Sequence, residues 1–411
     1  MSSQRRRKTM FCITRPGWTA CGFAMAFASA ILAAPAASAQ QQDLHAYIAG
    51  KPAALQPAFW VLVEGEQRDS VLNNMEIASL ALKQHEYREA ADAIDRALLD
   101  IEQYFGLTED ALKARSLWYE EGSKAFKGEP YERAMANYYR GMLDLRNGDY
   151  DNARASFANG NLQDAFAEEE QYRSDFALLI FLSAWAAERA GSQSLAEERY
   201  TELTALRPDF QRPPPEHDTL VIVETGTSPR KLADGVGHAE LVYRRGRGFK
   251  DRQVQLSIRG DAVAYPMEDI FLQASTRGGR HVDRILEGKI KYRNEASTRG
   301  SALTDTASAL SDVAIVSQDS GIGDVAAGLS VIGSMQLMMA QSAKPRADTR
   351  YWSGLPDAVH VFTYSSREHG TGPVTVTYLD KAGRPLPLLT QTIERLDDGR
   401  IAGLVWAVSQ H

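Results

Sequence analysis

Cysteine is nearly absent from this chain of 411 residues, which has only Cys12 and Cys21, both before residue 40. The rest of the chain therefore offers no disulfide, no thiolate nucleophile and no cysteine-based metal site. Histidine is also scarce, with eight residues, and no two of them stand four residues apart, which is the spacing of a helical zinc motif. The sequence has neither a phosphate-binding loop nor a Gly-x-Ser-x-Gly nucleophile elbow. We therefore expect no cofactor, no metal and no catalytic residue, and hence a protein that is not an enzyme.

The first 39 residues follow the order of a secretory signal peptide. Basic residues at 5–8 are followed by an Ala-rich apolar stretch at 21–34 and then by the small residues Ala37-Ser38-Ala39. A transmembrane anchor is the alternative, but the apolar stretch is shorter than the roughly 20 residues that a spanning helix needs. We expect residues 1–39 to be a signal peptide cleaved near Ala39. The mature protein is then expected in the periplasm, with outer-membrane association left open.

Negative charge is concentrated in one half of the expected mature chain. Removing residues 1–39, which hold five basic and no acidic residues, moves the net charge from −7 to −12. Residues 40–212 contain 30 acidic and 18 basic residues, whereas residues 213–411 contain 23 of each. Together with the stiff run Pro213-Pro214-Pro215, this asymmetry predicts two domains, 40–212 and 213–411. The acidic first domain also argues against nucleic acid as a partner.

Residues 71–210 have the period of α-helices and are rich in Ala, Leu, Glu and Arg. Small residues recur where the two helices of a tetratricopeptide-like pair would cross, and aromatic residues stand between them. Three stretches fit this pattern, with Ala78, Tyr87, Ala90, Ile94 and Ala97 in the first, Gly141, Gly148, Tyr150, Ala153, Phe157 and Gly160 in the second, and Ala184, Gly191, Ala196, Tyr200 and Leu203 in the third. The spacing between them is uneven. We predict a divergent tetratricopeptide-like helical array over residues 40–212.

The helical half contains one stretch with a concentration of aromatic and arginine residues. Pro130, preceded by Gly128-Glu129, is expected to begin a helix that carries these side chains. One interpretation makes the aromatic residues part of the core, which is usual at helical spacing. The functional interpretation is a concave groove that binds a partner, since aromatic and arginine side chains supply much of the binding energy at interfaces. The candidate partner-binding residues are Tyr131, Arg133, Tyr138 and Arg140.

After residue 212 the sequence changes to short runs rich in β-branched residues. The runs are residues 219–224, 239–243, 253–258, 262–265, 270–275, 359–364, 374–379, 388–394 and 401–408. Asp397-Asp398-Gly399 has the composition of a tight hairpin turn. We predict a mainly antiparallel β domain over residues 213–411, with a helical segment inserted at about 305–341. The fold class predicted for the chain is α+β.

One basic cluster lies in this second half, at the expected tip of a hairpin between two strands. Its members, the candidate anion-binding residues, are Arg244, Arg245, Arg247 and Lys250. The plain interpretation is a solvated turn. The functional interpretation is contact with an anionic lipid headgroup, a glycan phosphate or an acidic protein surface.

Four sequence blocks together resemble a known group of proteins. They are Gly128-Glu129-Pro130-Tyr131-Glu132-Arg133, Asn147-Gly148-Asp149-Tyr150-Asp151-Asn152-Ala153, residues 219–229, and Ala347-Asp348-Thr349-Arg350 followed by Trp352 and Leu355-Pro356. In this order they are similar to an uncharacterised family of bacterial envelope proteins, often lipoproteins, with a tetratricopeptide-like N-terminal half and a β-containing C-terminal half. The chain departs from that pattern at Cys21, because Trp18 stands where a lipidation site has a small aliphatic residue. The resemblance implies an architecture and an envelope location but no reaction.

Two functions remain open from the sequence. The first is a non-enzymatic periplasmic scaffold or adaptor that binds an envelope protein through the groove of its helical repeats, which offer extended binding surfaces. The second is an enzyme of envelope glycan (peptidoglycan) metabolism whose acid and base are carboxylates. We favour the scaffold, because carboxylate runs such as Glu168-Glu169-Glu170 are typical of solvated helix faces.

Overall fold

The computed structural model describes residues 43–105, 125–165, 175–234, 240–275, 348–397 and 402–411. The expected signal peptide and the expected helical insert at 305–341 lie outside these ranges. The chain divides into two compact units, Met1–Gln56 and Pro57–His411. In the described part of the first unit, Gly50 N donates to Ala46 O over 3.1 Å, closing a helical turn. Everything below concerns the second unit.

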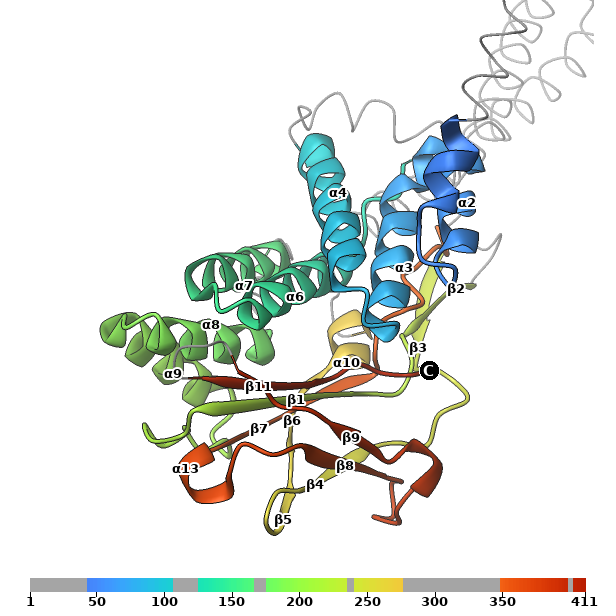
Figure 1. Cartoon of the computed structure of the whole chain (residues 1–411). Helices are drawn as coiled ribbons and strands as arrows, with labels where there is room; N and C mark the ends of the chain where they lie inside the picture. The colour runs from blue at the N-terminus through green and yellow to red at the C-terminus, as the bar shows by residue number, and fades with distance from the viewer. Residues whose placement is uncertain (1–42, 106–124, 166–174, 235–239, 276–347, 398–401) are drawn as a thin grey trace, which may run out of the picture. The chain divides into compact units, whose positions relative to one another are not determined.

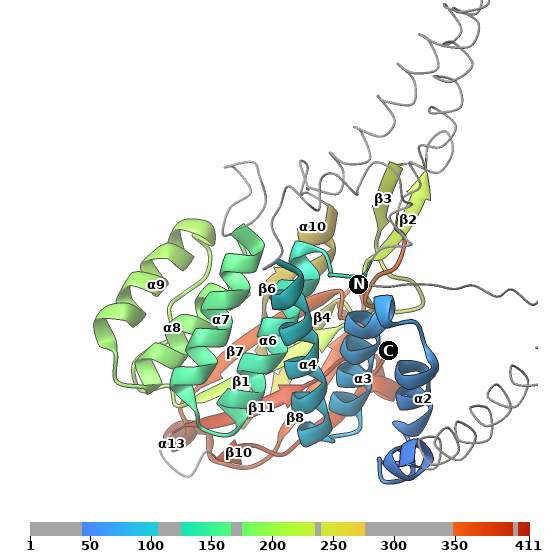
Figure 2. The ribbon, with the colours of Figure 1, turned by 90° about the horizontal axis from the view of Figure 1, so that it is seen from above.

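Helices form the N-terminal part of this unit, and antiparallel-rich sheets form the C-terminal part, which confirms the α+β class. The helices are α2 (Gln56–Glu64), α3 (Ser70–Lys83), α4 (Tyr87–Phe105), α6 (Pro130–Arg146), α7 (Tyr150–Ala165), α8 (Ala177–Arg189) and α9 (Gln193–Leu206), with a 3₁₀ turn, η1 (Gln67–Asp69), before α3. Consecutive helices pack as the pairs α3–α4, α6–α7 and α8–α9, and the pairs stand side by side because α4 contacts α6 and α7 contacts α8 (Figure 2). The three stretches in which small and aromatic residues recur fall within these three pairs.

The pair α6–α7 shows why small residues are needed where helices cross. A Cβ atom at Gly141 would lie 2.4 Å from Cε1 of Phe157, far inside van der Waals contact. The turn between the two helices uses Gly148 at φ 71°, a left-handed conformation that favours glycine. Asp149 Oδ1 then accepts a hydrogen bond of 3.2 Å from Asn152 N and so caps the start of α7. Asn147, Gly148 and Asp149 thus form the turn that connects α6 to α7.

The strands build one five-stranded sheet, one four-stranded sheet and one separate hairpin. They are β1 (Thr219–Thr225), β2 (Arg230–Asp234), β3 (Glu240–Arg244), β4 (Gln253–Ser257), β5 (Asp261–Val263), β6 (Tyr265–Asp269), β7 (Ala358–Tyr364), β8 (Val374–Leu379), β9 (Gln391–Ile393), β10 (Leu396–Asp397) and β11 (Gly403–Ala407). Two short helices, α10 (Ile270–Ser275) and α13 (Ser366–His369), and the 3₁₀ turn η5 (Pro387–Leu389) complete the described elements. The strand orders are β10-β11-β1-β7-β6, β5-β4-β8-β9 and β2-β3.

Strand β1 lies at the centre of the five-stranded sheet and is buried along its whole length. Val221 and Val223 face the four-stranded sheet and belong to the core between the two sheets, whereas Glu224 points to α6. Helices therefore cover one face of the five-stranded sheet and the second sheet covers the other (Figure 1). Burial on both faces explains why β1 reads as a continuous apolar run.

The structure corrects two parts of the β prediction. Strand β1 pairs with β11 in parallel, with Thr219 opposite Gly403, so the five-stranded sheet is mixed. Residues 270–275, predicted as a strand, form helix α10 instead. Asp269 Oδ1 accepts a hydrogen bond of 2.9 Å from Leu272 N at the start of this helix, and Ile270, Gln273 and Ala274 are buried at helical spacing.

The helical part ends and the sheets begin where the sequence predicts, between Leu206 and Thr219. The two parts nevertheless pack into the single unit Pro57–His411. Buried polar contacts join them: Trp352 N donates to Glu132 Oε1 over 2.7 Å, and Lys231 Nζ lies 2.5 Å from Glu129 Oε1. The proline-rich segment therefore separates the two parts along the sequence, while buried polar contacts join them in space.

Candidate functional site

The predicted groove residues lie on α6, and three of the four are inside the protein. Tyr131, Arg133 and Tyr138 are buried, because this face of α6 packs on the sheets and on α7. Arg140 keeps a partly exposed side chain, with its Nε 2.7 Å from Asp95 Oδ1. An open groove lined by these four side chains is therefore not formed in the described residues, and the interpretation of the aromatic residues as core describes them correctly.

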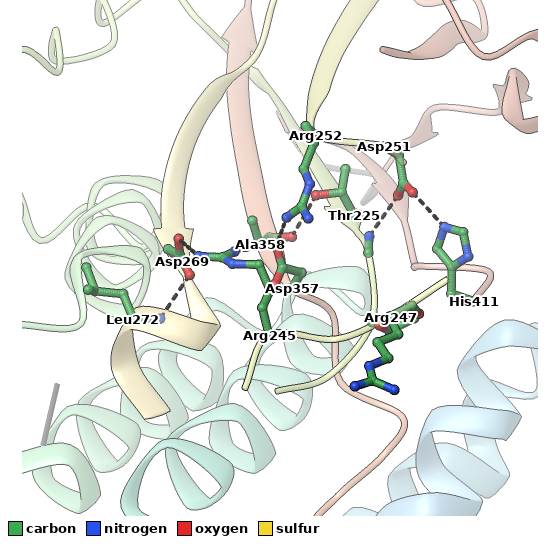
Figure 3. A network of polar contacts seen from close by, with 12 residues as sticks. Thr225, Arg245, Arg247, Asp251, Arg252, Asp269, Leu272, Asp357, Ala358 and His411 are labelled. Atoms are coloured by element: carbon green, nitrogen blue, oxygen red, sulfur yellow. Dashed lines mark hydrogen bonds and ion pairs between the residues drawn. The ribbon is translucent and has the colours of Figure 1, made fainter. Parts of the chain in front are cut away.

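The predicted anion-binding residues lie on a loop that connects two different sheets. Strands β3 and β4 do not pair with each other, so the loop is a crossover and not the tip of a hairpin. Arg245 is bound by two carboxylates, Asp357 at 2.5 Å and Asp269 at 2.6 Å (Figure 3). The charge of Arg245 is therefore used in ion pairs within the protein. The remaining three, Arg244, Arg247 and Lys250, are exposed.

A polar cavity of about 350 Å³ lies next to this crossover loop. Segments far apart in the sequence line it: the turn between α3 and α4, the end of β1, the start of β4, β8, η5 and the residues after β11. The lining residues are His85, Glu224, Asp251, Tyr378, Leu388, Leu389, Thr390, Gln391, Ser409, Gln410 and His411. Its size is at the lower end of the range of small-molecule sites.

Asp251 and His411 form a hydrogen-bonded pair on the cavity wall. His411 Nε2 lies 2.7 Å from Asp251 Oδ1, and the other carboxylate oxygen accepts a hydrogen bond of 2.7 Å from Gly226 N (Figure 3). Burial raises the pKa of Asp251, but the hydrogen bonds from His411 and Gly226 outweigh it and leave the pKa below its ordinary value. Asp251 is therefore ionised at neutral pH and fixes the orientation of the imidazole ring.

The wall also carries neutral polar groups and two leucines. Gln391 Nε2 donates to the hydroxyl oxygen of Tyr378 over 2.7 Å, and Ser409 Oγ donates to Gly226 O over 2.7 Å. Leu388, on η5, is fully exposed at 100%, and Leu389 beside it is half-buried. An exposed leucine next to a polar cavity is a feature of ligand sites, in which apolar contact accompanies a few oriented polar groups.

Glu224 stands at the base of the cavity and connects the helices to the sheets. Its Oε1 accepts hydrogen bonds from the Tyr138 hydroxyl and from Trp406 Nε1, and its Oε2 accepts from the Tyr139 hydroxyl and from Ser409 N, at 3.1 to 3.3 Å. Burial raises the pKa of Glu224 to about 7, against the opposing effect of these donors. Four donors occupy the two oxygens, so this carboxylate is a structural connection.

The buried acids predict how stability depends on pH. Burial raises the pKa values of Glu132 and Glu224 from 4.5 to about 7, and that of Glu268 to about 8. Each acid binds a proton more readily in the folded state than in the unfolded state, so its contribution to stability falls as the pH rises through this interval. Burial lowers the pKa of His360 to about 4 and also lowers that of His217, which opposes the trend below about pH 6.5.

We therefore expect the free energy of unfolding to fall as the pH is raised from 5 to 8. Urea denaturation at several pH values measures it, and Glu268→Gln should make the fall shallower because it removes the acid with the highest pKa of the three. Glu216→Gln, at an exposed position, is the control. A stability that is constant or rises over this interval would show that these carboxyls titrate at ordinary values.

Comparison of the chain with family models, with curated proteins and with solved structures finds no match. Among the described residues, no helix is long and apolar enough to cross a membrane. The same part of the chain contains no group of three or more His, Cys, Asp or Glu side chains arranged to hold a metal.

The cavity is not predicted from the sequence, although two features of the sequence point to it. Glu224 interrupts the apolar run Leu220-Val221-Ile222-Val223, and an acid in a strand buried on both faces requires several donors. Asp251 is the one acid in the basic cluster that begins at Arg244. The identity of its partner, His411, follows only from the fold. Asp348 and Arg350 form an ion pair of 2.7 Å.

Proposed function

We propose that this protein is an exported, non-enzymatic binding protein of the bacterial cell envelope that takes a small polar ligand in the cavity beside β1. One observation carries the proposal: oriented hydrogen-bonding side chains from six distant segments converge on one cavity of about 350 Å³. A fold gains no stability from leaving such a space open. Cavities of this kind are therefore the default candidates for a ligand site.

The envelope location rests on the sequence. The basic start, the apolar stretch and Ala37-Ser38-Ala39 support export, and the four blocks that begin with Gly128 support membership in an envelope family. The three helix pairs support a tetratricopeptide-like array, since small residues such as Gly141 stand at their crossings. Leu99 on α4 and Leu162 on α7 are more than half exposed and offer a contact for an envelope protein partner.

The enzymatic alternative has less support from the cavity. An acid or base needs a free oxygen within reach of the substrate. Glu224, the wall residue whose raised pKa suits such a role, has both oxygens occupied by four donors. Both oxygens of Asp251 are occupied as well, by His411 and Gly226. The two carboxylates of the described wall are therefore engaged in hydrogen bonds of the fold, which leaves them no free oxygen for acid or base catalysis.

The test compares the wild-type protein with Thr390→Trp, which fills the cavity mouth from an exposed position. The small-molecule fraction of a periplasmic extract is added, and the melting temperature is measured. We expect the wild type to melt roughly 5 °C higher with saturating ligand, because a ligand that binds only the folded state stabilises it. Thr390→Trp should show no shift. A wild-type protein that does not respond to the extract, or a variant that responds equally, would contradict the proposal.

A further inference from the structure

The charges at the cavity are already compensated by the protein. Asp251 is bound to His411 and to Gly226 N, and the two oxygens of Glu224 are occupied by four donors. Lys83, which approaches from the end of α3, donates to the His411 carbonyl oxygen. Among the described residues that line the cavity, a charged group of a ligand would therefore find its counter-charges already engaged, and burying a charge without a partner is costly. The cavity therefore favours a ligand without net charge.

The groups that remain available are neutral, and they include both donors and acceptors. The Tyr378 oxygen accepts from Gln391 Nε2, so its own O–H can donate to a ligand. Gln391 Oε1 and His411 Nδ1 can accept hydrogen bonds from a ligand. The hydrogen bonds described for these side chains use Nε2 of Gln391 and Nε2 of His411. A hydroxyl group both donates and accepts hydrogen bonds. Donors and acceptors that lie close together in the cavity wall are therefore complementary to the hydroxyl groups of a ligand.

The apolar part of the wall completes the match. Leu388 and Leu389, which line the cavity, supply its apolar surface. Such surfaces fit the C–H face of a sugar ring, whose edge carries hydroxyls. A volume of about 350 Å³ limits the ligand to a small molecule.

We infer that the cavity takes an uncharged polyhydroxylated ligand, one or two sugar rings in size, oriented by Tyr378, Gln391 and the Asp251–His411 pair. This inference rests on the proposed function and specifies its ligand class. Gln391 and Tyr378 determine the specificity, because they present a complementary donor and acceptor. The two leucines contribute contact area.

Isothermal titration calorimetry with defined probes tests the inference. The neutral probes are N-acetylglucosamine, N,N′-diacetylchitobiose and maltose, and the charged probes are spermidine and citrate. We expect at least one neutral sugar to bind, and Gln391→Leu and Tyr378→Phe each to weaken it about tenfold, as the loss of one hydrogen bond does. The matched control is Thr392→Val, on the same strand and the opposite face, which should leave the affinity unchanged.

Each other outcome overturns the inference in a distinguishable way. Cavity-dependent binding of spermidine or citrate without binding of any sugar overturns the ligand class and leaves the proposed function intact. The same holds if the periplasmic extract shifts the melting temperature in a Thr390-dependent manner while no sugar binds. Sugar binding that is equal in all variants places the site elsewhere. Urea denaturation of Gln391→Leu and Tyr378→Phe confirms that the variants fold, so weak binding is not mistaken for unfolding.

Discussion

Replacing Glu224 by alanine should lower the free energy of unfolding by roughly 4 kcal/mol. The substitution leaves four buried donors without their acceptor, on Tyr138, Tyr139, Trp406 and Ser409. Each unsatisfied buried donor costs about 1 to 3 kcal/mol, and partial relaxation and access to water from the cavity reduce the sum. Urea denaturation of the full chain measures the effect.

Two further substitutions separate the loss of the carboxylate from the loss of packing. Glu216→Ala, at an exposed acid near the start of β1, should change stability by less than about 0.5 kcal/mol. Combining Glu224→Leu with Tyr138→Phe and Tyr139→Phe should recover part of the loss, because removing donors together with the acceptor avoids unsatisfied groups. Wild-type stability in Glu224→Ala would mean that the carboxylate does not hold α6 on the sheet.

Trp352→Ala should cost about 3 to 5 kcal/mol, the usual range for removing a buried tryptophan. Trp352 is fully buried, its indole Nε1 donates to Ser79 Oγ over 2.7 Å, and its ring centroid lies 5.6 Å from that of Tyr139. The residue thus joins the segment before β7 to α3 and α6. Chemical denaturation followed by circular dichroism at helical and aromatic wavelengths measures the loss.

A series at the same position identifies the origin of that cost. Trp352→Phe keeps most of the apolar contact and loses the hydrogen bond to Ser79, so it should fall between the wild type and alanine. Ser353→Ala, at the exposed neighbour, is the matched control. If phenylalanine destabilised the protein as much as alanine does, the hydrogen bond would be the dominant contribution and the packing argument would fail.

The helix pairs could be predicted because their determinants are local. Gly141 must be small to admit Phe157, and Gly148 must adopt a left-handed conformation, so both leave a signal at fixed spacing in the sequence. Most strands could also be predicted, from their runs of β-branched residues. Helix α10 could not be predicted, because six residues are too few to separate helical from strand periodicity without the capping contact of Asp269.

The candidate site could not be predicted, because its residues are brought together only by the tertiary fold. Tyr138 resembles a binding residue in the sequence, and it becomes core because a sheet formed 86 residues later covers it. His411 and Asp251 are 160 residues apart, and nothing in either local sequence indicates the other. Periodicity assigns a side chain to a face of a helix, but it does not say whether that face meets solvent or another layer.

The parallel pairing of β1 with β11 has a consequence for how the chain acquires its structure. Trp406, on β11, reaches Glu224 from 182 residues further along the sequence, so this edge of β1 stays unpaired until nearly all of the chain is present. Contacts of such sequence separation form slowly, whereas the helix pairs can form from neighbouring residues. During folding, β1 is thus an apolar strand with an open edge, the kind of segment that associates with other chains. If the chain is exported as proposed above, it would meet this risk each time it refolds, and a chaperone that covers residues 219–225 would shorten the exposure.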